Sequence, residues 1–240
     1  MNIVLTRPLI DTENLMSKLL TMGHKIIHLP TLKISEIKIK EIDLNDYDAL
    51  IFTSANAVRF FKFKNEKREI LCFCVGSITE KKIRSHGFNN TISADGNVNA
   101  LKNLIINSQA LNQKSKLAYI CGDNLSTDLD TQLINENLII EKIMNYKSEK
   151  ITTLNEKNIE LLKKFSPNLL FVYSQRSAES LIEITRKYSL DGVMTQCTVM
   201  CISDKIGNYF SKSGLKKVKI FRPGDEIIEI EKNGKNKKFF

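Results

Sequence analysis

Short apolar runs alternate with amphipathic stretches along nearly the whole chain. The runs are about five residues long, which suits a buried strand, and the stretches between them carry apolar residues at helical spacing. This alternation is typical of α/β proteins that are built on parallel sheets. The sequence predicts about ten strands, which is more than one small open sheet usually holds. The expected strands are 2–6, 25–30, 48–54, 71–76, 90–93, 116–122, 138–146, 168–174, 198–203 and 218–221.

The chain also contains a long internal repeat. LIFTSANAVRFF at 50–61 matches LFVYSQRSAESL at 170–181, and CVGSITEKKIRSHGF at 74–88 matches CISDKIGNYFSKSGL at 201–215. A repeat of about 120 residues, itself several strand–helix units, favours two similar domains over a solenoid. We therefore predict an α/β fold with two similar open parallel-sheet domains of the flavodoxin-like type.

The order of the repeated segments predicts which parts of the chain fold together. The first strand–helix–strand unit lacks the strands that should follow it, and the C-terminal half lacks a beginning. The most economical arrangement joins residues 1–32 to residues 150–240 in one discontinuous α/β domain and inserts residues 37–143 as a second. The two crossing segments, 33–36 and 144–149, are then expected to pair as a two-stranded β-ladder hinge.

The formal net charge is +9, from 36 basic and 27 acidic residues, and it has two interpretations. A basic protein attracts polyanionic partners, such as nucleic acid, a membrane surface or a small polycarboxylate. Alternatively, the charge reflects an AT-rich codon bias, because lysine far outnumbers arginine. The charge is spread out except in a basic tail at 231–240, which we expect to be solvated and partly disordered. Because no nucleic-acid-binding motif accompanies the charge, we expect no nucleic-acid partner.

Signals for export, membrane insertion and cofactor binding are missing from the sequence. The apolar runs are far shorter than the roughly 20 residues of a membrane span, and the N-terminus does not resemble a signal peptide, so we expect a cytoplasmic protein with reduced thiols. The chain has five cysteines and three histidines, and we expect Cys72 and Cys74 to point to opposite faces of one strand. With no glycine-rich phosphate-binding motif either, we predict neither a metal nor a cofactor.

Polar residues follow several of the expected strands, at the edge where open α/β sheets bind ligands. Each position opens a helix, where free backbone N–H groups and a partial positive charge favour an anion. For any single serine, a purely local role as a helix cap is the simpler interpretation. The candidate binding residues are Arg7, Ser54, Asn56, Thr79, Ser174 and Ser177.

Several of these segments resemble uroporphyrinogen-III synthase. The N-terminal IVLTRP, the segments YDALIFTSANAVRFF and CVGSITEKKIRSHGF, the strand that ends in MNYK, and LLFVYSQRSAESL occur in the order of that family. The combination of TRP, DxLIFTSANAV and VGxxT before a helix that ends in Gly is the most specific part. The resemblance covers nearly the whole chain and implies two α/β domains, the second inserted through a β-ladder hinge.

The resemblance also implies a reaction. Enzymes of this family cyclise hydroxymethylbilane, a linear tetrapyrrole polycarboxylate, to uroporphyrinogen III in a cleft between the domains. Water is lost, and an azafulvene and a spiro intermediate lead to inversion of the last pyrrole ring. Tyr146 matches the tyrosine usually considered to assist loss of the hydroxyl, although packing of the hinge explains this residue equally well. Thr79, Ser54 and Ser174 match family positions, and the resemblance implies no metal or organic cofactor.

The sequence departs from the family pattern in its second half. Ser203 and Ile206 stand where the family usually has Gly and Thr, and Gln175 and Arg176 replace small residues or proline. Two other kinds of protein stay open: a non-catalytic two-domain protein that binds a small polyanionic ligand, and a nucleic-acid-associated protein. We expect a monomer with no membrane partner, and a transient contact with the preceding enzyme of the pathway stays open.

Overall fold

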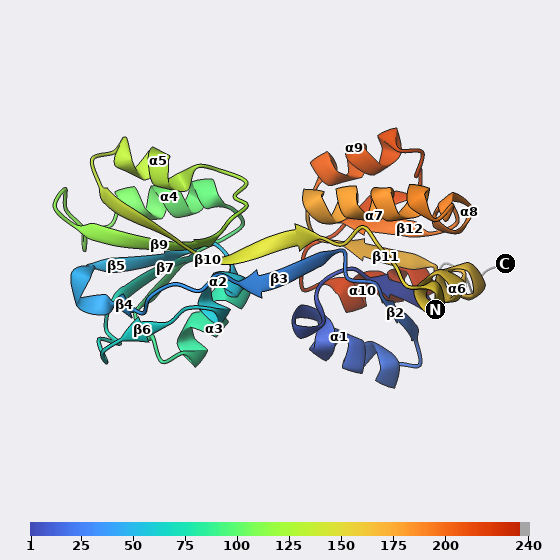
Figure 1. Cartoon of the computed structure of the whole chain (residues 1–240), viewed down its shortest axis with the longest axis horizontal. Helices are drawn as coiled ribbons and strands as arrows, with labels where there is room; N and C mark the ends of the chain where they lie inside the picture. Colours follow the sequence, from blue (N-terminus) through green and yellow to red (C-terminus); the bar gives the residue numbers. More distant parts are fainter. Residues whose placement is uncertain (236–240) are drawn as a thin grey trace. The chain divides into compact units, whose positions relative to one another are not determined.

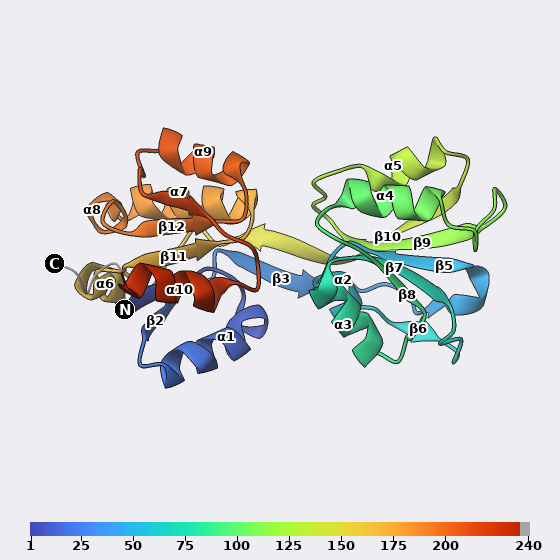
Figure 2. The ribbon, with the colours of Figure 1, turned by 180° about the vertical axis from the view of Figure 1, so that it is seen from behind.

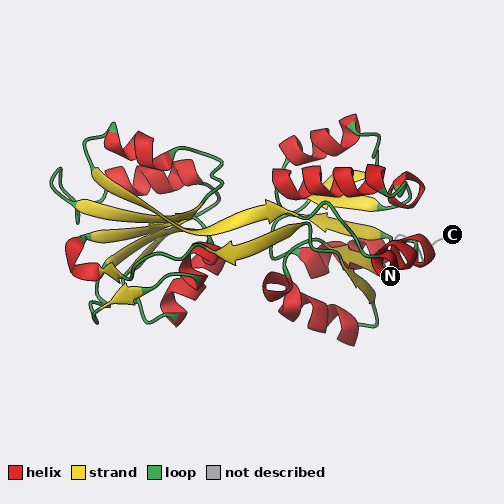
Figure 3. Cartoon of the chain, viewed as in Figure 1, coloured by secondary structure: helices red, strands yellow, loops and turns green. Residues whose placement is uncertain are grey.

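The computed structural model describes residues 1–235 and separates into two compact units (Figure 1). The first unit consists of Met1–Lys33 together with the chain from Glu149 onward, and the second is Ile34–Ser148. Strands and helices alternate in both units (Figure 3). The pairing within the main sheets is largely parallel. The predicted α/β fold class is therefore confirmed.

The first unit contains a five-stranded parallel sheet with the order β13-β12-β11-β1-β2. The strands are β1 (Asn2–Leu5), β2 (Lys25–His28), β11 (Leu169–Val172), β12 (Thr198–Cys201) and β13 (Val218–Ile220). The helices are α1 (Leu9–Thr21), α6 (Glu156–Phe165), α7 (Gln175–Lys187), α8 (Asp191–Met194), α9 (Asp204–Lys212) and α10 (Glu226–Lys235).

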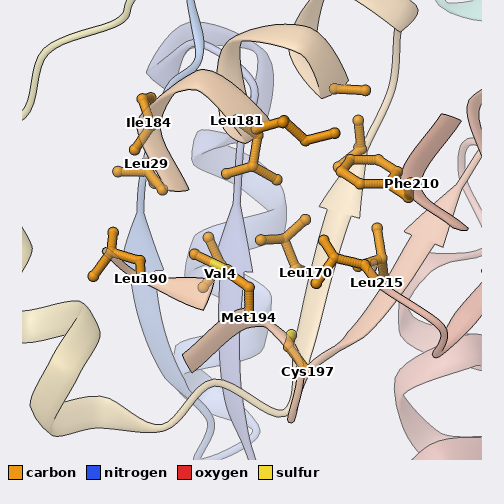
Figure 4. Packing of buried hydrophobic residues seen from close by; sticks show 14 of the residues in the cluster. Val4, Leu29, Leu170, Leu181, Ile184, Leu190, Met194, Cys197, Phe210 and Leu215 are labelled. Atoms are coloured by element: carbon orange, nitrogen blue, oxygen red, sulfur yellow. The ribbon is translucent and has the colours of Figure 1, made fainter. Parts of the chain in front are cut away.

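Apolar side chains cover both faces of this sheet, which is why its strands appear in the sequence as continuous apolar runs. Neighbouring residues of β1 point to opposite faces. Val4 packs in one cluster with Leu181 of α7 and Phe210 of α9 (Figure 4). Ile3 packs in the other cluster with Ile230 of α10, on the face that α1 and α10 cover (Figure 2). Because both faces are covered, a ligand must approach this sheet at its strand ends or edges.

The second unit contains a six-stranded sheet with the order β3-β10-β9-β5-β7-β8 and a small sheet that pairs β4 with β6. The strands are β3 (Leu32–Glu36), β4 (Ile42–Asp43), β5 (Ala49–Phe52), β6 (Phe63–Lys64), β7 (Leu71–Val75), β8 (Thr91–Ala94), β9 (Lys116–Gly122) and β10 (Ile139–Lys150). The helices are the 3-10 helix η1 (Leu44–Asp46) and α2 (Ala55–Arg59), α3 (Ser77–Ser85), α4 (Val98–Ile106) and α5 (Leu129–Ile134).

Two neighbouring strands, β3 and β10, contain the points at which the chain passes between the units. One boundary follows Lys33, within β3, and the other follows Ser148, within β10. β10 is one strand of 12 residues, and it includes most of the expected strand 138–146 and all of the expected crossing segment 144–149. Its register with β9 shifts between Met144 and Tyr146.

Each main sheet has one switch point, at which the connections from two neighbouring strands run in opposite directions. In the first sheet the chain leaves β1 toward β2 and leaves β11 toward β12, and in the second it leaves β5 toward β7 and β9 toward β10. Ligands of open α/β sheets bind at the carboxyl ends of such strand pairs. When the strands of each main sheet are renumbered along the chain, leaving out β3, the first sheet has the order 2-1-3-4-5 and the second has the order 3-2-1-4-5. The order 2-1-3-4-5 is that of flavodoxin, so the flavodoxin order occurs in the first unit.

The cysteines correct one expectation. Cys72 and Cys74 of β7 pack in the same core cluster, whereas Phe73 between them packs in a different one. The prediction of opposite faces was wrong, because residues two apart on a strand share a face. All five cysteines are free and buried.

The helix α10 follows the last expected strand and was not predicted. Residues 231–235 of the basic tail continue this helix, and residues 236–240 of the tail lie outside the described residues. Over the described part of the chain, no helix combines the length and the apolar character needed to cross a membrane.

Candidate active site

A pocket lies at the switch point of the second sheet. Its volume is about 150 Å³. Its walls come from β9 and β10, the residues that follow β5 and β9, and the first residue of α4. Most of the side chains carry a hydroxyl or amide group, so the pocket offers hydrogen bonds to a ligand. The lining residues are Thr53, Ser54, Val98, Tyr119, Asn124, Leu125, Ser126, Thr127 and Tyr146.

Tyr146 is held in this pocket through both its backbone and its ring. Its carbonyl oxygen accepts a hydrogen bond of 3.0 Å from the N–H of Asp123. The ring lies so close to Gly122 that a Cβ atom there would be 2.5 Å from the Tyr146 Cζ. The ring of Phe60 is stacked beside it with 6.4 Å between the centroids. The lack of a side chain at Gly122 therefore creates the space that the tyrosine ring occupies.

The residue before Tyr146 fixes the irregular part of β10. Asn145 is completely buried, and its Nδ2 donates a hydrogen bond of 2.7 Å to the carbonyl oxygen of Ala57 in α2. The carbonyl oxygen of Asn145 accepts a 2.9 Å bond from the N–H of Ile37. A bulge beside a site can redirect a side chain, and here two hydrogen bonds hold the shifted register next to Tyr146.

Ser54 lines the same pocket and caps α2. Its Oγ accepts a hydrogen bond of 3.2 Å from the N–H of Asn56. The side chain of Asn56 is turned toward its own helix, where its Oδ1 accepts a 2.6 Å bond from Nη1 of Arg59. Thr79 in α3 is only 6% exposed. The structure thus brings Ser54 and Tyr146 together at the pocket, and it does not place the side chains of Asn56 and Thr79 in the pocket wall.

Tyr119 also lines this pocket and was not predicted from the sequence. Its hydroxyl shares a hydrogen bond of 3.1 Å with the hydroxyl of Thr53. Burial raises the pKa of Tyr119, so the phenol stays protonated at neutral pH. In the sequence, Tyr119 lies within the apolar run KLAYICG, where no signal distinguishes a site tyrosine from a core residue.

The remaining predicted residues lie at the switch point of the first sheet. The Arg7 guanidinium carbon, beyond the end of β1, is 4.6 Å from the ring centroid of Tyr173, beyond the end of β11. Ser174 caps α7, because its Oγ accepts a 3.1 Å hydrogen bond from the N–H of Ser177. The hydroxyl of Ser174 also donates a 2.9 Å bond to the Oγ of Ser177. Ser54 and Ser174 therefore each cap a helix. A capped helix still presents its positive end to an anion.

The two departures in the second repeat have different surroundings. Ser203 is the N-cap residue of α9 and forms no capping bond with its side chain. Ile206 is 4% exposed and belongs to the apolar core of the first unit. Thr79, its counterpart in the repeat, is buried as well. At these two positions the exchange of Thr for Ile therefore changes the packing of a buried side chain.

The titratable groups indicate what the two switch points can do chemically. Among residues 1–235, no three His, Cys, Asp or Glu side chains are grouped so that they could hold a metal ion. Burial raises the pKa of Cys72, Cys197 and Cys201 to about 12, which makes these thiols poor nucleophiles. The groups described at the two switch points are phenols, serine hydroxyls, helix N-termini and a guanidinium. Such groups bind carboxylates and donate hydrogen bonds.

Solved structures with the same fold come from two bacteria. A mutant uroporphyrinogen III synthase from the extreme thermophile Thermus thermophilus has a TM-score of 0.60 and 14% identity, over 98% of this chain and 99% of that one. The uroporphyrinogen-III synthetase of Helicobacter pylori has a TM-score of 0.59 and 17% identity, over 92% and 93% of the two chains. At such identities the likeness concerns the fold.

Comparison at the level of sequence identifies the family. No curated protein matches the chain in sequence. The profile of one family, described as uroporphyrinogen-III synthase HemD, matches residues 13–221. This match includes the whole second unit and most of the first, although β1 lies before its start. The chain therefore belongs to the uroporphyrinogen-III synthase HemD family.

Proposed function

We propose that this enzyme cyclises hydroxymethylbilane to uroporphyrinogen III. Members of the family act on a tetrapyrrole in heme biosynthesis. In the proposed reaction the terminal hydroxyl leaves as water and an azafulvene forms. The substituted carbon of the last ring then attacks it, and the resulting spiro intermediate fragments and recloses with that ring inverted. The substrate becomes the product plus water, so the reaction requires no oxidant or reductant.

Catalysis of this kind depends mainly on geometry. The same substrate closes without the enzyme to the type I isomer, in which the last ring is not inverted. An enzyme must hold the flexible chain so that one carbon, rather than its neighbour, comes within reach of the azafulvene. Orientation of reacting groups can lower a barrier by several kcal/mol, roughly 7–11 in the best cases. We therefore expect most of the binding groups to position the substrate.

The position of Tyr146 is the observation that carries this proposal. Its ring lies in the pocket at the switch point of the second sheet, against Gly122 and together with Ser54. A phenol can donate a hydrogen bond to the departing oxygen and accept one afterwards. In our proposal, Tyr146 assists the loss of the hydroxyl as water. The hydroxyls of Thr53 and Tyr119 line the same pocket and supply further hydrogen bonds.

We propose that the other predicted residues bind the carboxylates of the substrate. Arg7 supplies a guanidinium, which can bind a carboxylate with two parallel hydrogen bonds. Ser174 and Ser177 lie at the N-terminus of α7, a helix of 13 residues, whose N–H groups and dipole favour an anion. Ser54 contributes its hydroxyl in the pocket and Thr79 its backbone amide near the start of α3, whereas Asn56 orients the Ser54 hydroxyl through its N–H.

The proposal is tested by incubating the protein with enzymically generated hydroxymethylbilane and separating the type I and type III isomers. The wild-type protein should yield mainly type III, whereas the same mixture without it yields type I. Tyr146→Phe should slow formation of type III by roughly 10–1000-fold, the usual value of a positioned proton donor. Its melting temperature should change little, because the ring remains.

Tyr47→Phe is the matched control. Tyr47 is a buried tyrosine of the same unit, whose hydroxyl interacts with Glu141. It precedes β5 and so lies at the opposite end of that strand from Ser54. This variant should retain the wild-type rate. A wild-type protein that yields type I alone would refute the proposed function. A Tyr146→Phe variant with the wild-type rate and a lower melting temperature would show that Tyr146 only packs the strand.

A further inference from the structure

A buried carboxylate starts the C-terminal helix. Glu226, the first residue of α10, is 8% exposed. Its Oε1 accepts a hydrogen bond of 3.0 Å from the hydroxyl of Tyr173, and its Oε2 accepts one of 2.9 Å from the N–H of Gly224. Burial of a carboxylate is costly unless hydrogen bonds compensate for the lost water. One oxygen thus ties α10 to the end of β11, and the other fixes the turn that precedes α10.

Apolar packing holds the same region in place. Ile230 of α10 is completely buried in the cluster that also contains Phe171 and Phe221. The ring of Tyr173 meets the ring of Phe221 edge to face, with 5.5 Å between the centroids and 84° between the planes. Figure 2 shows α10 across the face of the first sheet. The Tyr173 ring is therefore fixed by an aromatic contact and by its hydroxyl together.

Arg7 lies on this fixed ring. Its guanidinium carbon is 4.6 Å from the Tyr173 centroid, a distance at which a cation is attracted to a ring face. The backbone of Arg7 is fixed as well, since its carbonyl oxygen accepts a 2.8 Å hydrogen bond from Nε2 of His28. Within residues 1–235, no group forms a hydrogen bond or ion pair with the guanidinium. Its N–H groups are therefore available to a ligand.

We propose that Tyr173 and Glu226 are positioning residues that hold the Arg7 guanidinium at the switch point of the first sheet for a carboxylate of the substrate. The inference rests on the proposed function, because that function supplies the polycarboxylate. It assigns a role to α10, which begins after residue 221, where the family match ends. Burial raises the pKa of Tyr173, so its hydroxyl remains a donor to Glu226 at neutral pH.

Substrate affinity distinguishes this role from simple anchoring of α10. Tyr173→Phe keeps the ring under Arg7 and removes the bond to Glu226, and Glu226→Gln removes the charge at nearly constant shape. Both variants should raise KM by roughly 3–10-fold, the value of one hydrogen bond, with kcat within about twofold of wild type. In an Arg7→Ala background, Tyr173→Phe should raise KM no further, because the residue to be positioned is gone.

Tyr188→Phe is the matched control in the same unit. The Tyr188 hydroxyl accepts a 3.0 Å hydrogen bond from the N–H of Leu154, and this tyrosine follows the C-terminus of α7, whereas the candidate site lies at its N-terminus. This variant should leave KM unchanged even if its melting temperature falls. The proposal is overturned if Tyr173→Phe has the wild-type KM, if it raises KM equally with and without Arg7, or if Arg7→Ala has the wild-type KM.

Binding of a stable ligand separates this proposal from the proposed reaction. Uroporphyrin III, the oxidised and fluorescent form of the product, carries the same carboxylates and undergoes no conversion. Tyr173→Phe should weaken binding of uroporphyrin III only when Arg7 is present. Fluorescence titration of the wild type, Arg7→Ala, Tyr173→Phe and the double variant measures this. A wild-type protein that forms no type III isomer would refute the reaction, whereas additive effects of Arg7→Ala and Tyr173→Phe on this binding would refute the positioning role.

Discussion

Gly122→Ala moves the Tyr146 ring without changing a polar group. A Cβ atom at residue 122 would lie 2.5 Å from Cζ, 2.6 Å from Cε2 and 2.9 Å from the hydroxyl oxygen of Tyr146. Carbon atoms in contact are roughly 3.5 Å apart, so the ring must retreat by about 1 Å. A misplacement of this size at a reacting group costs about 100-fold in rate. We therefore expect kcat for the type III isomer to fall about 100-fold.

The folded state should tolerate this substitution. The backbone of Gly122 is outside the left-handed region, so alanine can adopt it. Replacing glycine stabilises a protein by about 0.4–1 kcal/mol through the unfolded state, and overpacking costs about 1–3 kcal/mol. The free energy of unfolding should therefore fall by no more than about 2.5 kcal/mol, a change that calorimetry can separate from the loss of activity.

The assay is the initial rate of type III formation at saturating substrate, with the melting temperature measured on the same samples. Gly192→Ala in α8 is the control, because a Cβ atom there meets nothing within 4 Å, and its rate should be that of the wild type. A kcat for Gly122→Ala within threefold of the wild-type value would refute the reasoning. Adding Gly122→Ala to Tyr146→Phe should not lower kcat by a further 100-fold, because the hydroxyl that alanine would displace is already absent. Such a further loss would also refute the reasoning.

Two further predictions follow from buried side chains. Ile206→Thr should lower the free energy of unfolding by about 1–2 kcal/mol, because it removes apolar contacts and buries a hydroxyl in the core of the first unit. Urea unfolding measures this loss, and a gain in type III formation would contradict the assignment of Ile206 to the core. The five buried cysteines should not react with a thiol reagent in the native protein at pH 8, where a pKa of about 12 leaves about one thiolate in 10⁴ at Cys72, Cys197 and Cys201. Fast labelling before unfolding in guanidinium would contradict this prediction.

The central strands of both main sheets were predictable because strands buried on both faces appear as continuous apolar runs. The polar segment KSEK at 147–150 carries no apolar signal of its own, and a strand was expected over 144–149 only from the order of the repeated segments. Those residues are in a strand that neighbours β3. The helix α10 was missed because EIIEIEKNGK mixes acidic residues, lysines and a glycine, and Ile230 is its completely buried residue.

The candidate site divides in the same way between local and distant interactions. The caps formed by Ser54 and Ser174 were predictable because a cap depends on residues two or three positions away. Tyr119 and Tyr173 were not, since each lies within or beside an apolar run. Glu226 gains its role from a bond to a residue 53 positions away. Only the folded chain brings such partners together.

The position of β1 inside its sheet determines the order in which the chain can fold during synthesis. Ile3 of β1 pairs with Leu169 of β11, and the ribosome delivers every strand from β4 to β10 before β11 emerges. The inserted unit can therefore complete its sheet while β1, which can already pair with β2, still lacks its other neighbour, β11. Contacts so distant in sequence form slowly, and an unpaired strand edge is open to wrong partners in the meantime. A chain that stops before Leu169 would retain the inserted unit and lose the other one.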